Sequence, residues 1–530
     1  MMLRICLCLL PLALATAQQS APHENPVVLY KGLGVWRHPI HTANAEAQKF
    51  FDQGLALTYG FNRYEALRSF RKAAELDPQA AMAYWGMAMA QGPYVNMDGD
   101  AEYNMKASCA AVDAGLKLTG TPERELAWLQ AAAKRCPEYQ PQPYIDAMRE
   151  LAKRWPDDLD AQTFYAESLL IPVRWHWYTA DGAAAPGVAE AEHTLEAVMR
   201  RWPDHPGANH LYIHAVESSP VPERAIASAQ RLMGIMPWAG HMVHMPGHIW
   251  LVLGDYAMAV AVNERAVEVD REYLEQSKTS SGYGAYYAHN LHFIAYARWM
   301  QGRKADGLRA ADELADAMAP MIGTMPDMAD AFNAVTVFGR VRFQDWDGIL
   351  KLAQPKDSLH ASMATWRYAR ALAFAGRGDR AAAAREQAAL EAIRAGFPAD
   401  APWGVNKAAD VLGIARAIVA ARLASTPAEA VPHWQRAVAL QDSLIYDEPP
   451  AWYYPVRESL GASLLLAGRA AEAEEVFREG VKRSPRNGRM LFGLMESLRA
   501  QGKNEDADLV KREFDAAWSK ADVTLKVEEL

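Results

Sequence analysis

The sequence predicts an all-α fold in which helical hairpins stack into one long solenoid with a concave groove. Pro203 and Pro237 lie 34 residues apart, the period of a tetratricopeptide repeat, a two-helix unit that usually closes on a proline. A chain of 530 residues with 51% hydrophobic content would otherwise need about three or four ordinary domains. Stacked repeats bury one continuous core, so a single solenoid is the simpler prediction.

Residues 1–17 are predicted to be a signal peptide. Arg4 precedes the apolar run ICLCLLPLALA, and small residues up to Ala17 form a cleavage pattern. The run is too short to anchor the chain in a bilayer, and no other segment approaches about 18 apolar residues. We therefore expect a periplasmic or secreted protein, with no membrane span after cleavage near Ala17.

Residues 18–43 are predicted to form an extended lead-in, because they contain three prolines and show little periodicity. His38 and His41 form a close pair in this segment, but Pro39 prevents them from sharing a helical face. A solvated or capping role is favoured for this pair over one in which it folds back across the groove.

The solenoid is predicted to span residues 44–520. In its first repeat, Gly54, Ala66 and Phe70 occupy positions where small residues let two helices approach and Phe fills the space between them. The period is lost at 98–143, and 175–186 is rich in glycine and small residues, so both segments are interpreted as insertions. The repeats then continue to a charged tail at 521–530, which is expected to act as a polar cap.

Two of the four cysteines, Cys109 and Cys136, follow the predicted signal peptide. In an oxidising compartment they are able to form one disulfide. Two free buried thiols are the alternative, because the sequence does not fix their separation.

The charge of the chain argues against nucleic acid as a partner. The formal net charge is −9 and the pI is about 6.0, and no stripe of Lys and Arg alternates with aromatic residues. A nucleic-acid-binding protein would need such a basic surface to replace counterions along the phosphate backbone.

Seven of the fifteen histidines fall within three blocks, HLYIHAVE, GHMVHMPGHIW and YAHNLHF. In the repeat register they occupy positions 2, 5 and 9 of three consecutive first helices. Those positions differ by about 60° and 40° around a helix, so they form one stripe that should face the groove. The predicted metal ligands are His210, His214, His241, His244, His248, His289 and His292.

Metal binding explains this cluster better than packing does. A single histidine on an apolar face is usually a core residue, but seven together leave many buried polar atoms without partners. Imidazole ligands without thiolate suit copper, zinc or iron, and copper is ranked first because Cu²⁺ has the highest affinity in the divalent series. Glu217, one turn beyond His214, is the candidate catalytic carboxylate.

The sequence resembles a family of exported bacterial tetratricopeptide proteins. The resemblance is carried by FDQGLALTYGFNRYEALRSFRKAAELDP, AMAYWGMAMAQGPYVN, the three histidine blocks and EPPAWYYPVRESLG, in this order, and it covers nearly the whole mature chain. It implies the repeat fold and the importance of these blocks, and it supplies no shared activity. Ala288 departs from the family pattern, which tends to have YPHN here.

Two classes of function remain. The first is a metalloenzyme with a mononuclear or dinuclear site, either a copper-dependent oxidoreductase or a zinc-dependent hydrolase with Glu217 as general base. The second is a periplasmic scaffold for a peptide or protein partner, or a metal carrier, without catalysis. For an enzyme, the substrate would be a small molecule or peptide in the groove. The candidate substrate-binding residues are Asn209, Tyr212, Trp250, Tyr286, Tyr287, Asn290, Trp452 and Arg457.

Overall fold

A computed structural model describes residues 26–96, 104–277, 283–323 and 326–530. The regular secondary structure of this part of the chain is almost entirely helical, and its only strands are the pair β1 (Pro402–Trp403) and β2 (Asn406–Lys407). Helices that are adjacent in the chain pack against one another from α1 to α25. The predicted all-α solenoid of helical hairpins is therefore confirmed, whereas the predicted signal peptide lies outside the described residues.

The N-terminal half holds the first thirteen helices. They are α1 (Ala45–Tyr59), α2 (Arg63–Leu76), α3 (Ala81–Gln91), α4 (Met105–Leu116), α5 (Glu123–Ala133), α6 (Pro141–Arg154), α7 (Leu159–Leu170), α8 (Val188–Arg201), α9 (Pro206–Glu217), α10 (Ile226–Ile235), α11 (Gly240–His244), α12 (Pro246–Val252) and α13 (Tyr256–Ser277). The 3₁₀ turns η2 (Ile171–Val173) and η3 (Pro222–Ala225) lie between them.

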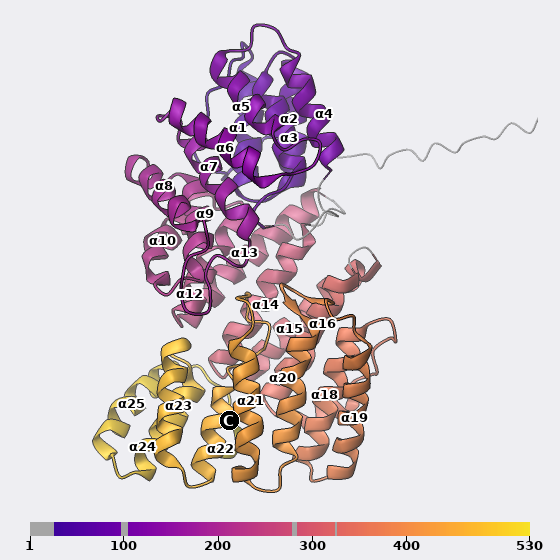
Figure 1. Cartoon of the computed structure of the whole chain (residues 1–530), viewed down its shortest axis with the longest axis vertical. Helices are drawn as coiled ribbons and strands as arrows, with labels where there is room; N and C mark the ends of the chain where they lie inside the picture. Colours follow the sequence, from indigo (N-terminus) through magenta and orange to yellow (C-terminus); the bar gives the residue numbers. More distant parts are fainter. Residues whose placement is uncertain (1–25, 97–103, 278–282, 324–325) are drawn as a thin grey trace, which may run out of the picture.

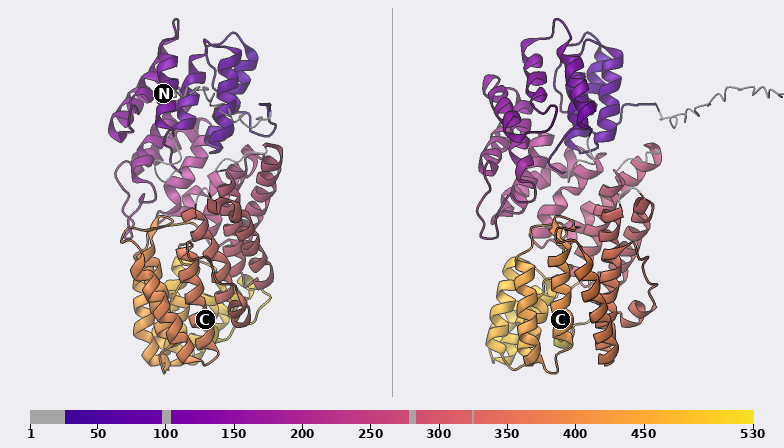
Figure 2. Two further views of the ribbon diagram at one scale, coloured as in Figure 1. Left: turned by 90° about the vertical axis from the view of Figure 1, so that its right-hand side faces the viewer. Right: turned by 45° about the vertical axis from the view of Figure 1, so that its right-hand side comes forward.

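The C-terminal half continues the same pattern. Its helices are α14 (Gly284–Met300), α15 (Lys304–Met318), α16 (Pro326–Arg342), α17 (Trp346–Lys351), α18 (His360–Gly376), α19 (Arg380–Gly396), α20 (Ala408–Arg422), α21 (Pro427–Asp442), α22 (Arg457–Leu466), α23 (Ala470–Arg483), α24 (Gly488–Ala500) and α25 (Asn504–Ala517), with 3₁₀ turns η4 (Ala319–Gly323) and η5 (Val527–Glu529). In Figures 1 and 2, α1–α7 lie at one end of the molecule, α14–α25 at the other, and α8–α13 between them.

The repeat positions recognised in the sequence have a direct steric cause. The Phe70 ring is fully buried between Gly54 on α1 and Gly86 on α3, and a Cβ at either glycine would overlap the ring. Phe477 occupies the same position between two glycines of the C-terminal repeats. A glycine on each side therefore lets three helices pack around one aromatic ring.

The two segments interpreted as insertions have different structures. The described part of 98–143 contains α4 and α5, and Cys109 on α4 forms a disulfide with Cys136 after α5, with a Cα–Cα distance of 5.7 Å. The segment 175–186 is a loop with one antiparallel bridge between Tyr178 and Ala184. This loop buries Trp177, whose ring centroid lies 5.9 Å from that of His214.

The described part of the lead-in, residues 26–43, is extended and crosses the N-terminal helices. Its His38 is only 5% exposed, and its Nδ1 donates to Asp160 at 2.7 Å. The prediction of a solvated or capping His38 is therefore wrong, because the side chain is buried and donates a hydrogen bond to the Asp160 carboxylate on α7. His41 is exposed, as expected.

Asp160 is the buried anchor of the lead-in. Besides His38, it receives the Trp36 indole N–H at 3.0 Å and the Tyr59 hydroxyl at 2.5 Å, and His205 Nε2 lies 3.3 Å away. Burial alone would raise the pKa of Asp160, but the hydrogen bonds from His205 and His38 outweigh it and hold this pKa well below its usual range. The group His38, Asp158 and Asp160 has metal-ligand geometry, but these donors already satisfy the Asp160 carboxylate.

We expect Asp160→Asn to destabilise the N-terminal hairpins by about 3 kcal/mol at pH 7, because the donors then face an amide instead of a charge. A carboxyl whose pKa is depressed on folding stabilises the protein above its unfolded pKa of about 3.9. The difference in unfolding free energy between the variant and the wild type should therefore persist down to about pH 4. It should decrease as the pH falls further, because Asp160 then becomes protonated in the unfolded wild type. Denaturant unfolding at several pH values measures this, and Asp157→Asn is the matched control because Asp157 is 92% exposed. Equal stability of both variants at pH 7 would contradict the prediction.

None of the described helices is long and apolar enough to cross a membrane.

Candidate metal centre

The seven predicted ligands lie on three neighbouring hairpins. His210 and His214 are on α9, the next three lie along α11 and α12, and His289 and His292 are on α14. Met245, between α11 and α12, keeps helical dihedrals of −50° and −37°, so His244 and His248 remain one turn apart on the same face. The register predicted from the repeats therefore places the three blocks on successive first helices.

The start of the second block is fixed by a buried carboxylate. A Cβ at Gly240 would overlap Oδ1 of Asp270, which is fully buried on α13. Asp270 also receives the Tyr283 hydroxyl at 2.9 Å and the Asn290 amide at 2.7 Å, and burial raises its pKa to about 7. Gly240 and Asn290, each from a different histidine block, are therefore explained by contacts with Asp270.

Three histidines form the first cluster, His210, His214 and His241. The Nε2 atom of His210 lies 3.2 Å from Nε2 of His214 and 3.1 Å from Nε2 of His241. All three side chains are at most 1% exposed. Three ring nitrogens thus point at one position in the interior.

The second cluster comprises His244, His248 and His289. The Nε2 atoms of His244 and His248 are 2.6 Å apart, and the His289 ring centroid lies 4.9 Å from that of His244. One donor atom of each of the three lies within 4.8 Å of the others. His289 is partly exposed, whereas its two partners are buried.

The two clusters are adjacent. Ring centroids are 5.7 Å apart both between His214 and His248 and between His241 and His244. Phe61, in the turn between α1 and α2, packs on the first cluster with ring centroids 4.4 Å from His210 and 5.0 Å from His241. Its φ of 54° is unusual for a bulky residue, which marks a turn held in place by its surroundings.

Four of the buried histidines have an acceptor at their other ring nitrogen. His210 Nδ1 donates to the Tyr59 carbonyl at 2.6 Å, and His244 Nδ1 donates to Asn263 Oδ1 at 2.6 Å. His214 and His248 donate from Nδ1 to the two oxygens of Glu217, at 3.1 and 2.6 Å. These acceptors place the proton on Nδ1 and leave a lone pair on each Nε2.

The amide of Asn263 is itself oriented by a second hydrogen bond. Its Nδ2 donates to the Ala259 carbonyl at 2.8 Å, so the oxygen faces His244. A metal-bound histidine usually donates its free ring N–H to a carboxylate or carbonyl in this way, which fixes the ring. The surroundings of both clusters therefore have the pattern of a metal site.

Burial keeps these imidazoles neutral. It lowers the pKa of His214 to about 3, that of His244 to about 4 and that of His292 to about 3. It also lowers the pKa of His210, His241, His248 and His289, assisted by repulsion from neighbouring imidazoles. A neutral imidazole is the form that binds metal.

His292 is placed apart from both clusters. It lies one turn beyond His289 on α14, and its ring packs against Phe332 with a centroid distance of 5.8 Å. It does not belong to any of the converging donor groups among the described residues.

Glu217, the predicted catalytic carboxylate, lies between the two clusters. It lies on the Nδ1 side of His214, and its two oxygens accept from one histidine of each cluster. It is 2% exposed, and burial raises its pKa well above the usual value, so a nearby cation would favour its ionised form.

The sequence reasoning missed Glu448. This residue precedes α22, yet its carboxylate contacts His248 Nδ1 and is 8% exposed. The block EPPAWYYPVRESLG was recognised as important, but no periodicity connects Glu448 to a histidine 200 positions earlier. Tyr59 and Asn263 were missed for a similar reason, because a main-chain carbonyl and a lone amide carry no motif.

Of the predicted substrate-binding residues, Tyr286 contacts the clusters. Its ring centroid lies 4.7 Å from that of His241, and its hydroxyl lies 3.1 Å from that of Tyr94. Trp250, on α12, is partly buried against the hydrophobic core.

The other six predicted substrate-binding residues have partners within the scaffold. Asn209 donates to main-chain carbonyls before its own helix, Tyr212 donates to Glu196, Tyr287 to Glu313 and Asn290 to Asp270, Arg457 pairs with Asp442, and Trp452 packs on Phe338 and Tyr368. These contacts direct the six side chains to structural partners.

No known family model matches the chain. An uncharacterized protein of Aquifex aeolicus (strain VF5) is 39% identical over 61 residues, which are 11% of this chain and 8% of that protein. The match therefore spans less than a tenth of the relative's length.

Two solved structures show low similarity over most of the chain. The human IFIT1 dimer with m7Gppp-AAAA is 11% identical, covers 90% of this chain and 91% of its own, and has a TM-score of 0.32. The APC/C hetero-tetramer Cut9-Hcn1 is 13% identical, covers 91% and 88%, and has a TM-score of 0.29. These values are too low to assign a ligand or partner, and the resemblance to the exported family stays a prediction.

Proposed function

We propose that the protein is an exported metalloprotein that binds two transition-metal ions side by side, one in each histidine cluster. The first ion would be held by His210, His214 and His241, and the second by His244, His248 and His289. Glu217 would orient one ligand of each ion through the Nδ1 atoms. His292 would lie outside the ligand set.

The observation that carries this proposal is that the Nε2 atoms of two histidines point at one another in each cluster. In both clusters an Nδ1–H is already donated to an oxygen, so the Nε2 lone pairs meet at 2.6 to 3.2 Å with no proton between them. Two acceptors at that distance repel one another. A cation between them turns the repulsion into coordination, and unprotonated, buried imidazoles are suited to it.

Copper is the favoured metal. The converging donors are imidazole nitrogens without thiolate, which suits copper, zinc and iron, and copper binds such sites most strongly among the divalent ions. Copper would supply one-electron redox chemistry and zinc would supply Lewis acidity. The proposed activity is therefore oxidoreduction, with a zinc-dependent hydrolase as the alternative.

The surroundings of the clusters favour a small substrate. The five histidines on α9, α11 and α12 are at most 3% exposed, whereas His289 is partly exposed. We infer that a substrate would approach from the His289 side, with Tyr286 beside it. Glu217 has both oxygens engaged by imidazoles, which favours an orienting role for it over general-base catalysis.

A carrier or scaffold without catalysis is the second candidate. It is supported by the solenoid of helical hairpins, since such folds present extended binding surfaces. A carrier would bind metal and release it without catalysing a reaction, and a pure scaffold would bind no metal.

Metal analysis of untagged protein, exported to the periplasm of a Gram-negative host and purified without chelator, tests the proposal. We expect two equivalents per chain, one lost in His210→Ala/His214→Ala and the other in His244→Ala/His248→Ala. His360→Ala/His433→Ala is the matched control, because both of these histidines are exposed and remote from the clusters. Metal-free wild type, unchanged in all variants, would reject the metal centre and leave the scaffold.

A further inference from the structure

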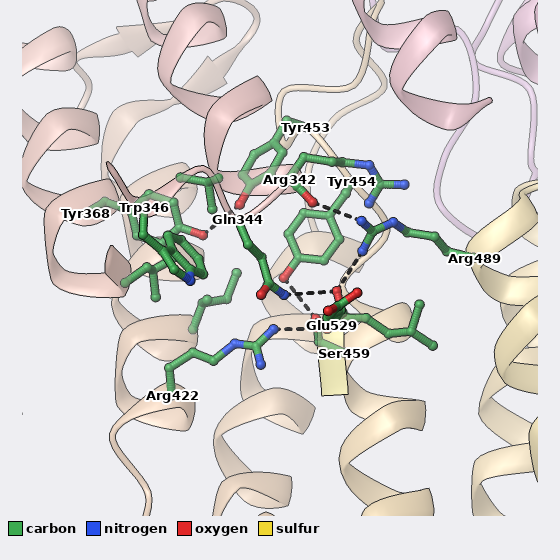
Figure 3. Close-up of a pocket in the computed structure, with 14 residues that line it drawn as sticks. Arg342, Gln344, Trp346, Tyr368, Arg422, Tyr453, Tyr454, Ser459, Arg489 and Glu529 are labelled. Atoms are coloured by element: carbon green, nitrogen blue, oxygen red, sulfur yellow. Dashed lines mark hydrogen bonds between the residues drawn. The ribbon is translucent and has the colours of Figure 1, made fainter. Parts of the chain in front are cut away.

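The C-terminal repeats hold a second site, and none of the clustered histidines lines it. Five of the helices that contribute to it, α16, α18, α20, α22 and α24, are each the first helix of a hairpin, and Trp346 at the start of α17 adds a further side chain. Figure 3 shows that polar side chains from several of these elements converge there, among them Arg342, Arg422, Ser459 and Arg489. The first helices of a solenoid line the surface that such folds use for extended ligands.

Residues 522–530 of the chain lead into this site, and Glu529 and Leu530 line it. Leu525 and Leu530 are 8% and 2% exposed, and Val523 and Val527 pack partly buried against the same core. Thr524, Lys526 and Glu528 are exposed. The segment predicted as a solvated polar cap is thus anchored through every second residue from 523 to 527 and again at 530.

The walls of the site recognise the main chain of this segment. The Glu529 carbonyl accepts from Arg489 at 2.8 Å and from Gln344 at 3.2 Å. The Leu530 carbonyl accepts from Arg422 at 2.9 Å and from Ser459 at 3.2 Å. Donors from four separate hairpin positions therefore converge on two consecutive carbonyls, a mode of recognition that tolerates many sequences.

The charge of the site favours an acidic ligand. Arg342 is paired with Glu458 at 2.7 Å, but Arg489, which is 5% exposed, donates to the main-chain oxygens of Glu529 and Arg342. A buried guanidinium bound only to neutral oxygens is better stabilised by a carboxylate, which forms stronger, charge-assisted hydrogen bonds. A cavity of about 30 Å³ also remains beside the segment, enough for a bulkier ligand side chain.

We propose that this site docks an acidic peptide of a partner protein, held by aliphatic side chains and by a helical turn like that of Val527–Glu529, and that residues 522–530 occupy it as an intramolecular competitor. Only two of the nine side chains in the segment are buried below one tenth exposure, so its hold on the site is modest. The inference does not depend on the metal centre.

The test uses a shortened protein that lacks residues 524–530. It keeps Asp522, which caps α15 through the Lys304 and Ala305 amides, and Val523, whose carbonyl accepts from Trp518. The probe is the fluorescent peptide ADVTLKVEEL, which has the sequence of residues 521–530 and carries a free carboxylate at its end. Fluorescence anisotropy should show binding to the shortened protein at least about 10-fold tighter than to the full chain, where the site is filled.

Variants of the shortened protein distinguish binding at this site from non-specific binding of the peptide. Arg489→Gln and Arg422→Ala should each weaken binding by about 10-fold, the size expected for losing a hydrogen bond to a charged group. Arg416→Ala is the matched control on the same helix, because Arg416 is exposed and pairs with Glu391.

The proposal would be overturned if the folded, shortened protein did not bind the peptide. It would also be overturned if the full chain bound the peptide as tightly as the shortened protein does. If the shortened protein does not fold, a protease site placed at the exposed Ser519 and Lys520 allows the segment to be cut after folding. The cut segment should then exchange with labelled peptide. A cut segment that stays bound through gel filtration and does not exchange within a day would show it to be a fixed part of the fold.

Discussion

Glu217→Ala should weaken metal binding in both histidine clusters at once. The carboxylate accepts the Nδ1–H of His214 in the first cluster and of His248 in the second, and losing such an orienting partner typically costs about 10- to 100-fold in metal affinity. Because Glu448 also contacts His248, the second cluster keeps one carboxylate and should lose less. Competition titration with a copper-binding dye measures the two affinities.

The double variant Glu217→Ala/Glu448→Ala should remove this difference and weaken the second cluster as much as the first. Glu223→Ala is the matched control, since Glu223 is exposed on the next turn of the chain. Circular dichroism must show that each variant is folded. Affinities equal to wild type in a folded Glu217→Ala protein would show that the carboxylate orients neither ligand.

Removing the disulfide should give the largest loss of stability. Cys109 and Cys136 are 27 residues apart, and closing a loop of that length in the unfolded chain corresponds to about 3.5 kcal/mol of stabilisation. Cys109→Ser/Cys136→Ser should therefore shift unfolding of the N-terminal hairpins to lower denaturant concentration. The fluorescence of the buried Trp85 and Trp128 reports on this region.

Reduction of the wild type provides the internal control for that experiment. A reductant should shift the wild-type transition to the position of the double variant and should leave the double variant unchanged. If oxidised and reduced wild type unfold at the same denaturant concentration, the cross-link contributes nothing to stability.

The fold and the grouping of the histidines were predictable because both depend on short-range periodicity. A repeat of 34 residues indicates a pair of helices. A spacing of four residues, as between His210 and His214 or between His244 and His248, indicates that both side chains lie on one face of a helix. Gly54 and Phe70 are part of the same signal, since their packing recurs in each unit. Once successive first helices are known to be neighbours, the register alone brings imidazoles from three hairpins together.

The division of the histidines into two clusters was not predictable. It depends on which nitrogen of each ring meets an oxygen, and the Tyr59 carbonyl and Asn263 amide that decide this have no sequence signature. His292 shares the predicted stripe but packs on Phe332, because a stripe about 60° wide still contains side chains that diverge. The burial of residues 525 and 530 depends on the curvature of the whole solenoid, which no local pattern encodes.

The contact between Glu448 and His248 has a consequence for how the molecule responds as a whole. It joins the loop before α22 to an imidazole on α12 directly, so a change of charge at that imidazole acts on the C-terminal repeats without passing through the helices between them. Binding and release of metal at the histidine clusters would then alter contacts in both halves of the solenoid, because the contact between Glu448 and His248 links the two halves directly.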